Sequence, residues 1–133
     1  GGNWKCNPEK LEVVQQLCAA FREGLPDEAL GKVEVALFPS TLHISLARTQ
    51  VKDGIAIGAQ NVSVERDCGA FTGEINVSMA REAGCSWVLV GHSERRHKVA
   101  QESIQDTVAK VELAQEAGLG VILCVGELLE ERE

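Results

Sequence analysis

The segment Trp87-Val88-Leu89-Val90-Gly91-His92 decides the fold class of this chain. Its first four residues are all apolar, so a strand formed from them must be covered on both faces. The runs at residues 33–38 and 121–125 are also largely apolar, and segments with helical periodicity lie between the runs. Covered strands that alternate with helices predict an α/β fold with a parallel sheet and right-handed crossovers.

The remaining elements follow from the same periodicities and from turn residues. Strands are expected at residues 2–6, 33–38, 55–59, 87–90 and 121–125, with a long polar segment at 60–73. The first helix is expected to begin at Asn7-Pro8-Glu9, and others cover residues 42–49 and 78–83. A capping box at 103–106 opens the last helix, whose expected apolar face carries Ile104, Val108 and Val111. This order fits either an open doubly wound sheet or a stretch of an eight-stranded barrel.

The composition excludes several classes of protein. The chain has 133 residues, which suits one domain, and a net charge of −7, which disfavours nucleic acid and anionic membranes as partners. No apolar stretch has the length of a membrane span. The five cysteines form no Cys-x-x-Cys pair, so we expect reduced thiols, no metal site and a cytoplasmic protein. An organellar location is the alternative, because the sequence begins at Gly1 without a Met or a visible leader.

Candidate reactive residues follow the expected strands, where the functional groups of parallel α/β folds gather. Asn3 and Lys5 lie two residues apart and therefore project to the same side of the first strand, opposite to Trp4. In a barrel Trp4 would face the helices, and Asn3 and Lys5 would point inward. The alternative is an exposed lysine in a frayed terminal strand.

The residues after the fourth strand offer a second candidate. Gly91 allows a sharp exit, and His92 would then lie near the N-terminus of a helix, where the neutral imidazole is favoured. The alternative is a polar turn in which Glu94 pairs with Arg95 or Arg96. Gln60 and Asn61, after the third strand, either line a pocket or protrude, and Cys124 is expected to be a small buried apolar residue.

Four segments in the same order resemble the triosephosphate isomerase family. They are Gly-Gly-Asn-Trp-Lys-Cys-Asn at residues 1–7, Gly-Ala-Phe-Thr-Gly-Glu-Ile at 69–75, Val-Gly-His-Ser-Glu-Arg-Arg at 90–96, and residues 124–133. The resemblance covers essentially the whole chain, but only about half of a full (β/α)8 barrel of about 250 residues. It implies a TIM barrel that interconverts dihydroxyacetone phosphate and glyceraldehyde 3-phosphate through an enediolate, without a cofactor, in glycolysis and gluconeogenesis.

The resemblance also implies roles for individual residues. Lys5 would supply positive charge to the substrate phosphate and the enediolate, Asn3 would donate a hydrogen bond to a substrate oxygen, and His92 would be the neutral electrophile. Further residues would support the site or form the contact of a homodimer. The supporting residues would be Glu94, which pairs with Lys5, Ser93 and Cys124, and the dimer contact would contain Phe71, Thr72 and Gly73.

The resemblance implies that the general base and the later phosphate-binding loops lie outside residues 1–133. We therefore interpret the chain as a single partial barrel domain of about five strands, truncated at both ends and inactive by itself. Two alternatives are a non-catalytic structural or interaction fragment of a barrel protein and another barrel enzyme that uses a phosphorylated substrate.

Overall fold

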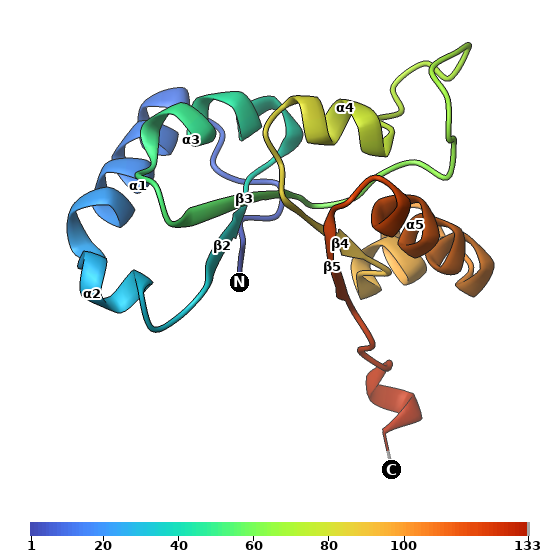
Figure 1. The fold of residues 1–133 in the computed structure, drawn as a ribbon. Coiled ribbons are helices and arrows are strands. Elements are labelled where there is room, and N and C mark those ends of the chain that lie inside the picture. The colour runs from blue at the N-terminus through green and yellow to red at the C-terminus, as the bar shows by residue number, and fades with distance from the viewer. Residues whose placement is uncertain (133) are drawn as a thin grey trace.

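The computed structural model describes residues 1–132 and contains one five-stranded parallel sheet covered by helices (Figure 1). Helices follow the strands along the chain, as the alternation of apolar runs and helical patterns predicts. The strands are β1 Gly2–Asn3, β2 Val35–Phe38, β3 Ile55–Ala59, β4 Trp87–Val90 and β5 Gly120–Leu123. The helical elements are α1 Leu11–Gly24, α2 Asp27–Leu30, η1 Thr41–His43, α3 Ile44–Gln50, α4 Val77–Glu82, the π-helical turn η2 Arg95–Val99, α5 Ile104–Glu116 and η3 Leu129–Glu131.

The strand order distinguishes the two architectures that the sequence leaves open. The strands lie side by side in the order in which they occur in the chain, β1-β2-β3-β4-β5, and each neighbouring pair is parallel. A doubly wound sheet would instead reverse its order at a switch point. Sequential order is that of a (β/α)8 barrel, so the structure is a five-strand part of such a barrel.

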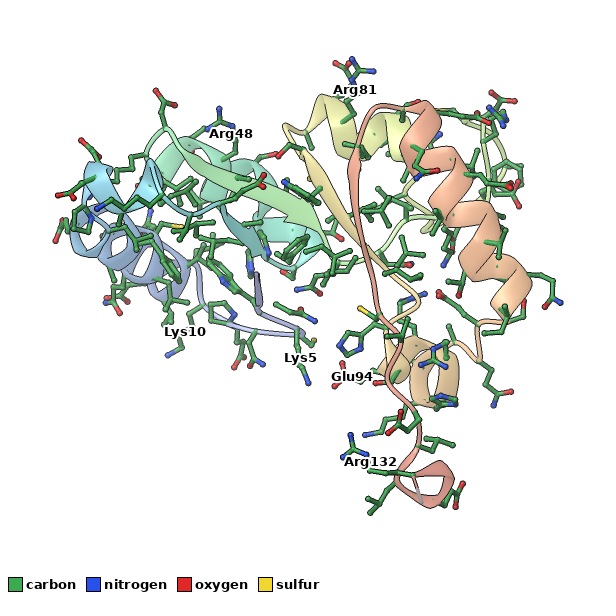
Figure 2. The ribbon with its side chains drawn as sticks, turned by 60° about the horizontal axis from the view of Figure 1, so that its bottom comes forward. Lys5, Lys10, Arg48, Arg81, Glu94 and Arg132 are labelled. Carbon is green, nitrogen blue, oxygen red and sulfur yellow. The ribbon has the colours of Figure 1, made fainter. Side chains whose placement is uncertain are left out.

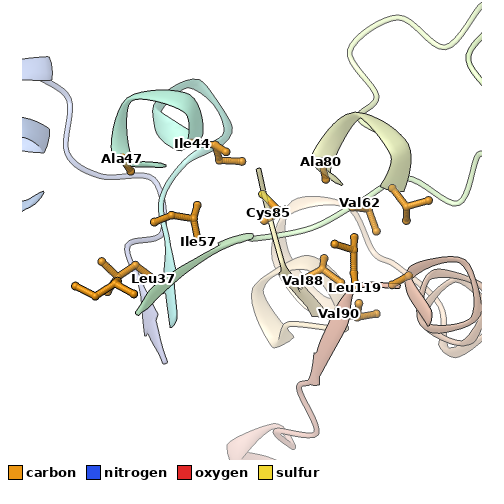
Figure 3. Close-up of a cluster of buried hydrophobic side chains, with 14 of the residues drawn as sticks. Leu37, Ile44, Ala47, Ile57, Val62, Ala80, Cys85, Val88, Val90 and Leu119 are labelled. Atoms are coloured by element: carbon orange, nitrogen blue, oxygen red, sulfur yellow. The ribbon is translucent and has the colours of Figure 1, made fainter. Parts of the chain in front are cut away.

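Alternate residues of each strand face two different layers. Leu37, Ile57 and Val88 belong to the large core between the sheet and the helices, where Figure 3 shows them with residues of α3 and α4. Their strand neighbours Phe38 and Leu89 form a smaller cluster on the opposite, inner side. Both faces of the central strands are therefore apolar, which accounts for their continuous apolar runs.

Two glycines allow large side chains to fill the inner side. A Cβ atom at Gly58 would lie 2.3 Å from the Phe38 ring, and one at Gly120 would lie 2.5 Å from the Trp87 ring. Neither glycine can therefore be replaced by a larger residue without displacing an aromatic ring. Because these rings pack directly against the glycines, the inner side of the sheet is closely packed below the carboxyl ends of the strands.

The N-terminal segment differs from the expectation for residues 2–6. The strand ends at Asn3, because Lys5 adopts a left-handed backbone conformation with φ +55°, which a strand cannot contain. The helix begins at Leu11 and not at Asn7-Pro8-Glu9, since the first helical hydrogen bonds are accepted by the carbonyl of Lys10. Residues 7–10 instead carry the chain from the sheet to the helical layer.

The buried face of α5 also differs from the expectation. The capping box between Ser103 and Asp106 is present. However, Ile104 and Val108 are 62% and 51% exposed. The side that faces the sheet carries the polar Thr107 and Lys110 besides Leu113 and Ala114. Helical periodicity identified the stripe of apolar residues, but the polar side chains on the other side are buried because they find partners.

No helix within residues 1–132 is both long and apolar enough to cross a membrane.

Candidate active site

A cavity of about 200 Å³, lined mainly by polar residues, opens at the carboxyl ends of β1, β3 and β4. Three elements that are distant in the sequence contribute to it: the exit of β1, the exit of β3 and the turn after β4. The structure therefore brings together the candidate residues that follow separate strands. The lining residues are Asn3, Lys5, Cys6, Gln60, Asn61, His92, Glu94, Arg95 and Val99.

An ion pair joins two sides of this cavity. The Nζ atom of Lys5 lies 2.8 Å from Oε1 of Glu94, and Figure 2 shows the two side chains facing each other. The hydrogen bond from Lys5 holds the pKa of the Glu94 carboxyl below its usual value. Glu94 thus remains an anion that keeps the Lys5 ammonium at the cavity, and the alternative pairing of Glu94 with Arg95 or Arg96 is wrong.

The His92 ring has a defined orientation within the turn. Its Nδ1 atom accepts a hydrogen bond of 3.2 Å from the backbone N–H of Glu94. A carboxylate oxygen of Glu94 lies farther from Nδ1, at 3.6 Å. Because an N–H donor points at Nδ1, this geometry fits the tautomer that carries its ring proton on Nε2. The ring can therefore offer one N–H donor from Nε2.

The backbone of Lys5 is held in its unusual conformation by two amide side chains. Its N–H donates to Oδ1 of Asn3 at 2.9 Å, and its carbonyl accepts from Nε2 of Gln60 at 2.9 Å. Gln60 also donates to the carbonyl of Phe38 at 2.8 Å, which joins the exits of β1 and β2. A non-glycine residue with positive φ persists only where its surroundings determine it in this way.

The turn after β4 depends on Gly91 and two arginines. Gly91 has φ +71°, and a Cβ atom there would lie 2.9 Å from the side chain of Thr107. Arg96 donates to the carbonyl of Gly91 at 2.9 Å and also to the carbonyl of Gly126. Arg95 pairs with Glu102 at 2.5 Å. Both arginines therefore stabilise the turn that presents His92 and Glu94.

Other residues singled out in the sequence do not line this cavity. Ser93 precedes η2 within the turn. Cys124 lines a larger apolar cavity of about 580 Å³ between α5 and β5, and burial raises the pKa of its thiol. The segment with Phe71, Thr72 and Gly73 belongs to the long loop between β3 and α4, which projects from the molecule in Figure 1.

Sequence reasoning missed the buried charges beside this cavity. Lys110 and Glu102 have side chains that are only 4% and 8% exposed, and they form an ion pair of 2.7 Å. Lys110 follows Thr107 by three residues and precedes Ala114 by four, so its place on the buried face of α5 could have been inferred from helical spacing. The partner Glu102 lies outside the helix and carries no comparable signal.

The described residues offer no site for a metal ion. Within residues 1–132, no group of three or more His, Cys, Asp or Glu side chains is arranged to hold one. All five cysteines lie in this part of the chain and are free thiols.

Comparison with known proteins identifies the family. The sequence model of the family described as triosephosphate isomerase matches residues 1–133. The chain belongs to the triosephosphate isomerase family. The five strands in sequential order agree with this family's barrel, of which they form a part.

Curated members of the triosephosphate isomerase family align with almost all of this chain. A triosephosphate isomerase of Marinobacter nauticus is 46% identical over 133 residues, which are 99% of this chain and 51% of that protein. A cytosolic form of Gracilaria gracilis is 41% identical, over 98% of this chain and 52% of its own. A chloroplastic form of Arabidopsis thaliana is 40% identical over an alignment that covers 100% of this chain and 40% of that protein. The chain thus spans about half the length of its relatives or less.

Proposed function

We propose that this chain forms the part of a triosephosphate isomerase site that holds the substrate phosphate and polarises its carbonyl group. The reaction is the cofactor-independent interconversion of dihydroxyacetone phosphate and glyceraldehyde 3-phosphate through an enediolate. The observation that supports it most directly is the convergence of Asn3, Lys5 and His92 on one cavity at the strand ends, in a member of this family.

Lys5 supplies the positive charge that this substrate requires. Its ammonium lies at the cavity beside Glu94, and about half of its side-chain surface is exposed to an incoming ligand. An ammonium held in advance stabilises both a phosphate dianion and the negative charge that develops on the enediolate oxygens. The chain as a whole is acidic, with a net charge of −7, so this local cation determines where an anion binds.

His92 and Asn3 provide neutral donors for the substrate oxygens. With Nδ1 occupied by the Glu94 N–H, the Nε2–H of His92 donates to the carbonyl oxygen and shuttles a proton between neighbouring oxygens. Oδ1 of Asn3 accepts from the Lys5 N–H, and this bond orients the amide so that its NH2 group is the donor toward substrate.

The cavity by itself lacks a general base for abstraction of a proton from carbon. Glu94 is the only carboxylate among its lining residues within the described part of the chain, and the Lys5 hydrogen bond keeps its pKa low. A carboxylate with a lowered pKa is a weak base. Losing a positioned base costs about 10²–10⁴ in rate, so the 133-residue chain alone is inactive in this proposal.

A chimera tests the proposed function. Residues 1–133 are joined to the part of the Marinobacter nauticus relative that follows the aligned region, and turnover of glyceraldehyde 3-phosphate is measured. We expect activity in the chimera and none in the isolated chain. Lys5→Met should lower kcat/KM by about 10²-fold or more, and His92→Gln by about 10²–10⁴-fold. Glu116→Gln, on the surface pair with Arg66, is the control and should change nothing.

Three outcomes would contradict the proposal. A folded chimera without turnover would remove the catalytic assignment, and so would one that keeps full activity after substitution of Lys5 and His92. Turnover by the isolated chain would contradict the inactivity of residues 1–133. Circular dichroism of each variant separates a loss of chemistry from a loss of folding.

A homodimer and a cytosolic location belong to the same proposal. The loop with Phe71 and Thr72 projects from the body, and Phe71 is 41% exposed, which favours a contact with a second subunit. The related proteins include a cytosolic and a chloroplastic form, and we favour the cytosol without nucleic acid or membrane as partners. Replacement of Phe71 and Thr72 by Ser in the chimera should lower the mass measured by light scattering to that of a monomer.

One observation favours a second candidate, a non-catalytic interaction fragment. The cavity between α5 and β5 is lined mainly by apolar side chains, and four of them are at least half exposed: Ile104, Val108, Leu123 and Val125. Such a surface is typical of a contact with another polypeptide. This candidate predicts concentration-dependent association of the isolated chain in sedimentation experiments, whereas a stable monomer at all concentrations would contradict it.

A further inference from the structure

Lys110 is a buried cation in the middle of α5. Its side chain is 4% exposed, and its Nζ atom lies 2.7 Å from Oε1 of Glu102 and 3.0 Å from Oδ1 of Asn61. A buried charge is tolerated only when it is paired and hydrogen-bonded. Lys110 therefore joins two segments, the loop after β3 and the segment before α5, and each of them leads to the cavity of the candidate active site.

Glu102 extends this pair toward the turn after β4. Its Oε1 atom is shared between Lys110 and Nε of Arg95, and the N–H of Glu102 donates to the carbonyl of Arg95 at 3.2 Å. Arg95 directly follows Glu94, whose carboxylate holds the Lys5 ammonium at 2.8 Å. The first arm of the network thus runs from Lys110 through Glu102 and Arg95 to the side chain of Lys5.

The second arm runs through the loop after β3. Asn61 accepts the hydrogen bond from Lys110, and its neighbour Gln60 donates to the carbonyl of Lys5 at 2.9 Å. This arm ends on the backbone of Lys5, whereas the first arm ends on its ammonium. Two independent routes from one buried pair therefore meet at a single residue.

Lys5 is the residue that needs such support. Its φ of +55° is unfavourable for a residue with a side chain, and its ammonium must be held on a long, flexible stem. We propose that the buried Lys110–Glu102 pair positions Lys5, acting on the ammonium through Arg95 and Glu94 and on the backbone through Asn61 and Gln60.

Stability alone does not account for the pair. Replacing a buried ion pair with apolar residues is often neutral or stabilising, so burial of charge is weak evidence for a role in stability. Oε2 of Glu102 is also buried without a hydrogen-bond partner within residues 1–132, which lowers stability further. The pair is poorly optimised for stability, and two chains of contacts connect it to Lys5. Positioning of Lys5 therefore explains the pair better than stability does.

Acetylation of lysine amines in the native 133-residue chain tests the inference. The chain is treated with a limiting dose of acetylating reagent, and the rate at Lys5 is divided by the rate at the exposed Lys10 by mass spectrometry. The test variant carries Glu102→Gln and Lys110→Met together, which leaves neither of the two charges unpaired. Glu116→Gln is the matched control, because it removes a surface pair with Arg66. Glu94→Gln shows the effect of releasing Lys5 directly.

We expect the double variant to raise the Lys5-to-Lys10 ratio by about two- to fivefold, the factor that corresponds to loss of an exposed ion pair. Glu94→Gln should raise the ratio similarly, the control should leave it unchanged, and adding Glu94→Gln to the double variant should have little further effect. A folded double variant with the wild-type ratio would overturn the inference. A purely structural role would change the melting temperature without changing this ratio.

A milder variant decides the question if the double variant does not fold. Asn61→Ala removes only the second arm, and we expect it to shift the NMR signals of the Gln60 side-chain amide and the Lys5 backbone amide. Unchanged signals in folded Asn61→Ala would refute the second arm and with it the inference. The role of Lys5 as a ligand of the substrate rests on the proposed function. Neither measurement uses turnover, so the result of the positioning test does not depend on whether the chimera is active.

Discussion

Lys5 and Glu94 form a 2.8 Å ion pair although they are separated by 89 positions in the chain. The pair joins the exit of β1 to the turn after β4, two strands that are not neighbours in the sheet. It spans the carboxyl-end edge of the sheet and holds an ammonium at a cavity that His92 also lines. Because both side chains are partly exposed, the pair leaves room for a ligand to contact the ammonium.

Glu94→Gln should reduce stability at neutral pH but not in acid. The folded-state pKa of Glu94 is lowered by the Lys5 hydrogen bond. The pair therefore stabilises the fold above the unfolded-state pKa of about 4.3, and this contribution is lost as the pH falls through the lower folded-state pKa. The measurement is thermal unfolding of both proteins across the acid range, repeated in a Lys5→Met background, where the substitution should have almost no effect. A difference between the two proteins that is independent of pH would contradict this prediction.

Ser103→Ala should destabilise the chain by about 1 kcal/mol. The Ser103 hydroxyl accepts from the Asp106 N–H at 3.0 Å, and the Asp106 carboxylate accepts from the Ser103 N–H at 2.8 Å. Removing the hydroxyl leaves one N–H at the start of α5 without its partner. Urea denaturation measures the change, and Ser78→Ala on the exposed side of α4 is the control, with an expected change below about 0.5 kcal/mol. Equal effects of the two substitutions would show that the cap contributes nothing.

Gly91→Ala should destabilise the chain by about 1–2 kcal/mol through its backbone conformation alone. Gly91 has φ +71°, and the added Cβ would also lie 2.9 Å from Cγ2 of Thr107. Adding Thr107→Ser removes that methyl group, so denaturation should show partial recovery and leave the backbone cost. Gly24→Ala is the control, because no atom lies within 4 Å of its added Cβ, and it should be neutral or stabilising by up to about 1 kcal/mol. A Gly91→Ala protein as stable as the wild type would contradict the described turn.

The cysteines should react with iodoacetamide in two groups. Cys6 and Cys68 are exposed, whereas Cys18 and Cys85 are buried, and burial raises the pKa of Cys85 to about 11. Since the thiolate is the reacting form, Cys85 should remain unmodified in the native chain at mildly alkaline pH and react after denaturation. Peptide mass spectrometry over time gives the order of modification. Modification of Cys85 at the rate of Cys68 in the native chain would refute this packing.

Much of the secondary structure could be predicted from the sequence. The strands at residues 55–59 and 87–90 and the capping box at Ser103 have the expected bounds, because apolar runs and local caps are determined by near neighbours. Trp4 packs against the helix-side core, as the alternation of side chains in a strand predicts. The apolar stripe of α5 is present as predicted, but such a stripe does not reveal which side of a helix meets the sheet.

Some features of the candidate site could be predicted from the sequence, and others depend on the tertiary structure. The sequence by itself placed Asn3 and Lys5 on the first strand and His92 after the fourth, and the rule that strand ends gather at one edge of a parallel sheet was enough to group them. Only the tertiary structure decided that Lys5 turns with positive φ and that Lys110 is buried, whereas the pairing of Glu94 with Lys5 was already implied by the family resemblance. The physical reason is that apolar runs and local caps depend on residues a few positions away, whereas the backbone conformation of Lys5 is held by Gln60, 55 positions farther along the chain. The partner that makes a charge tolerable inside a protein is selected by the packing of remote segments.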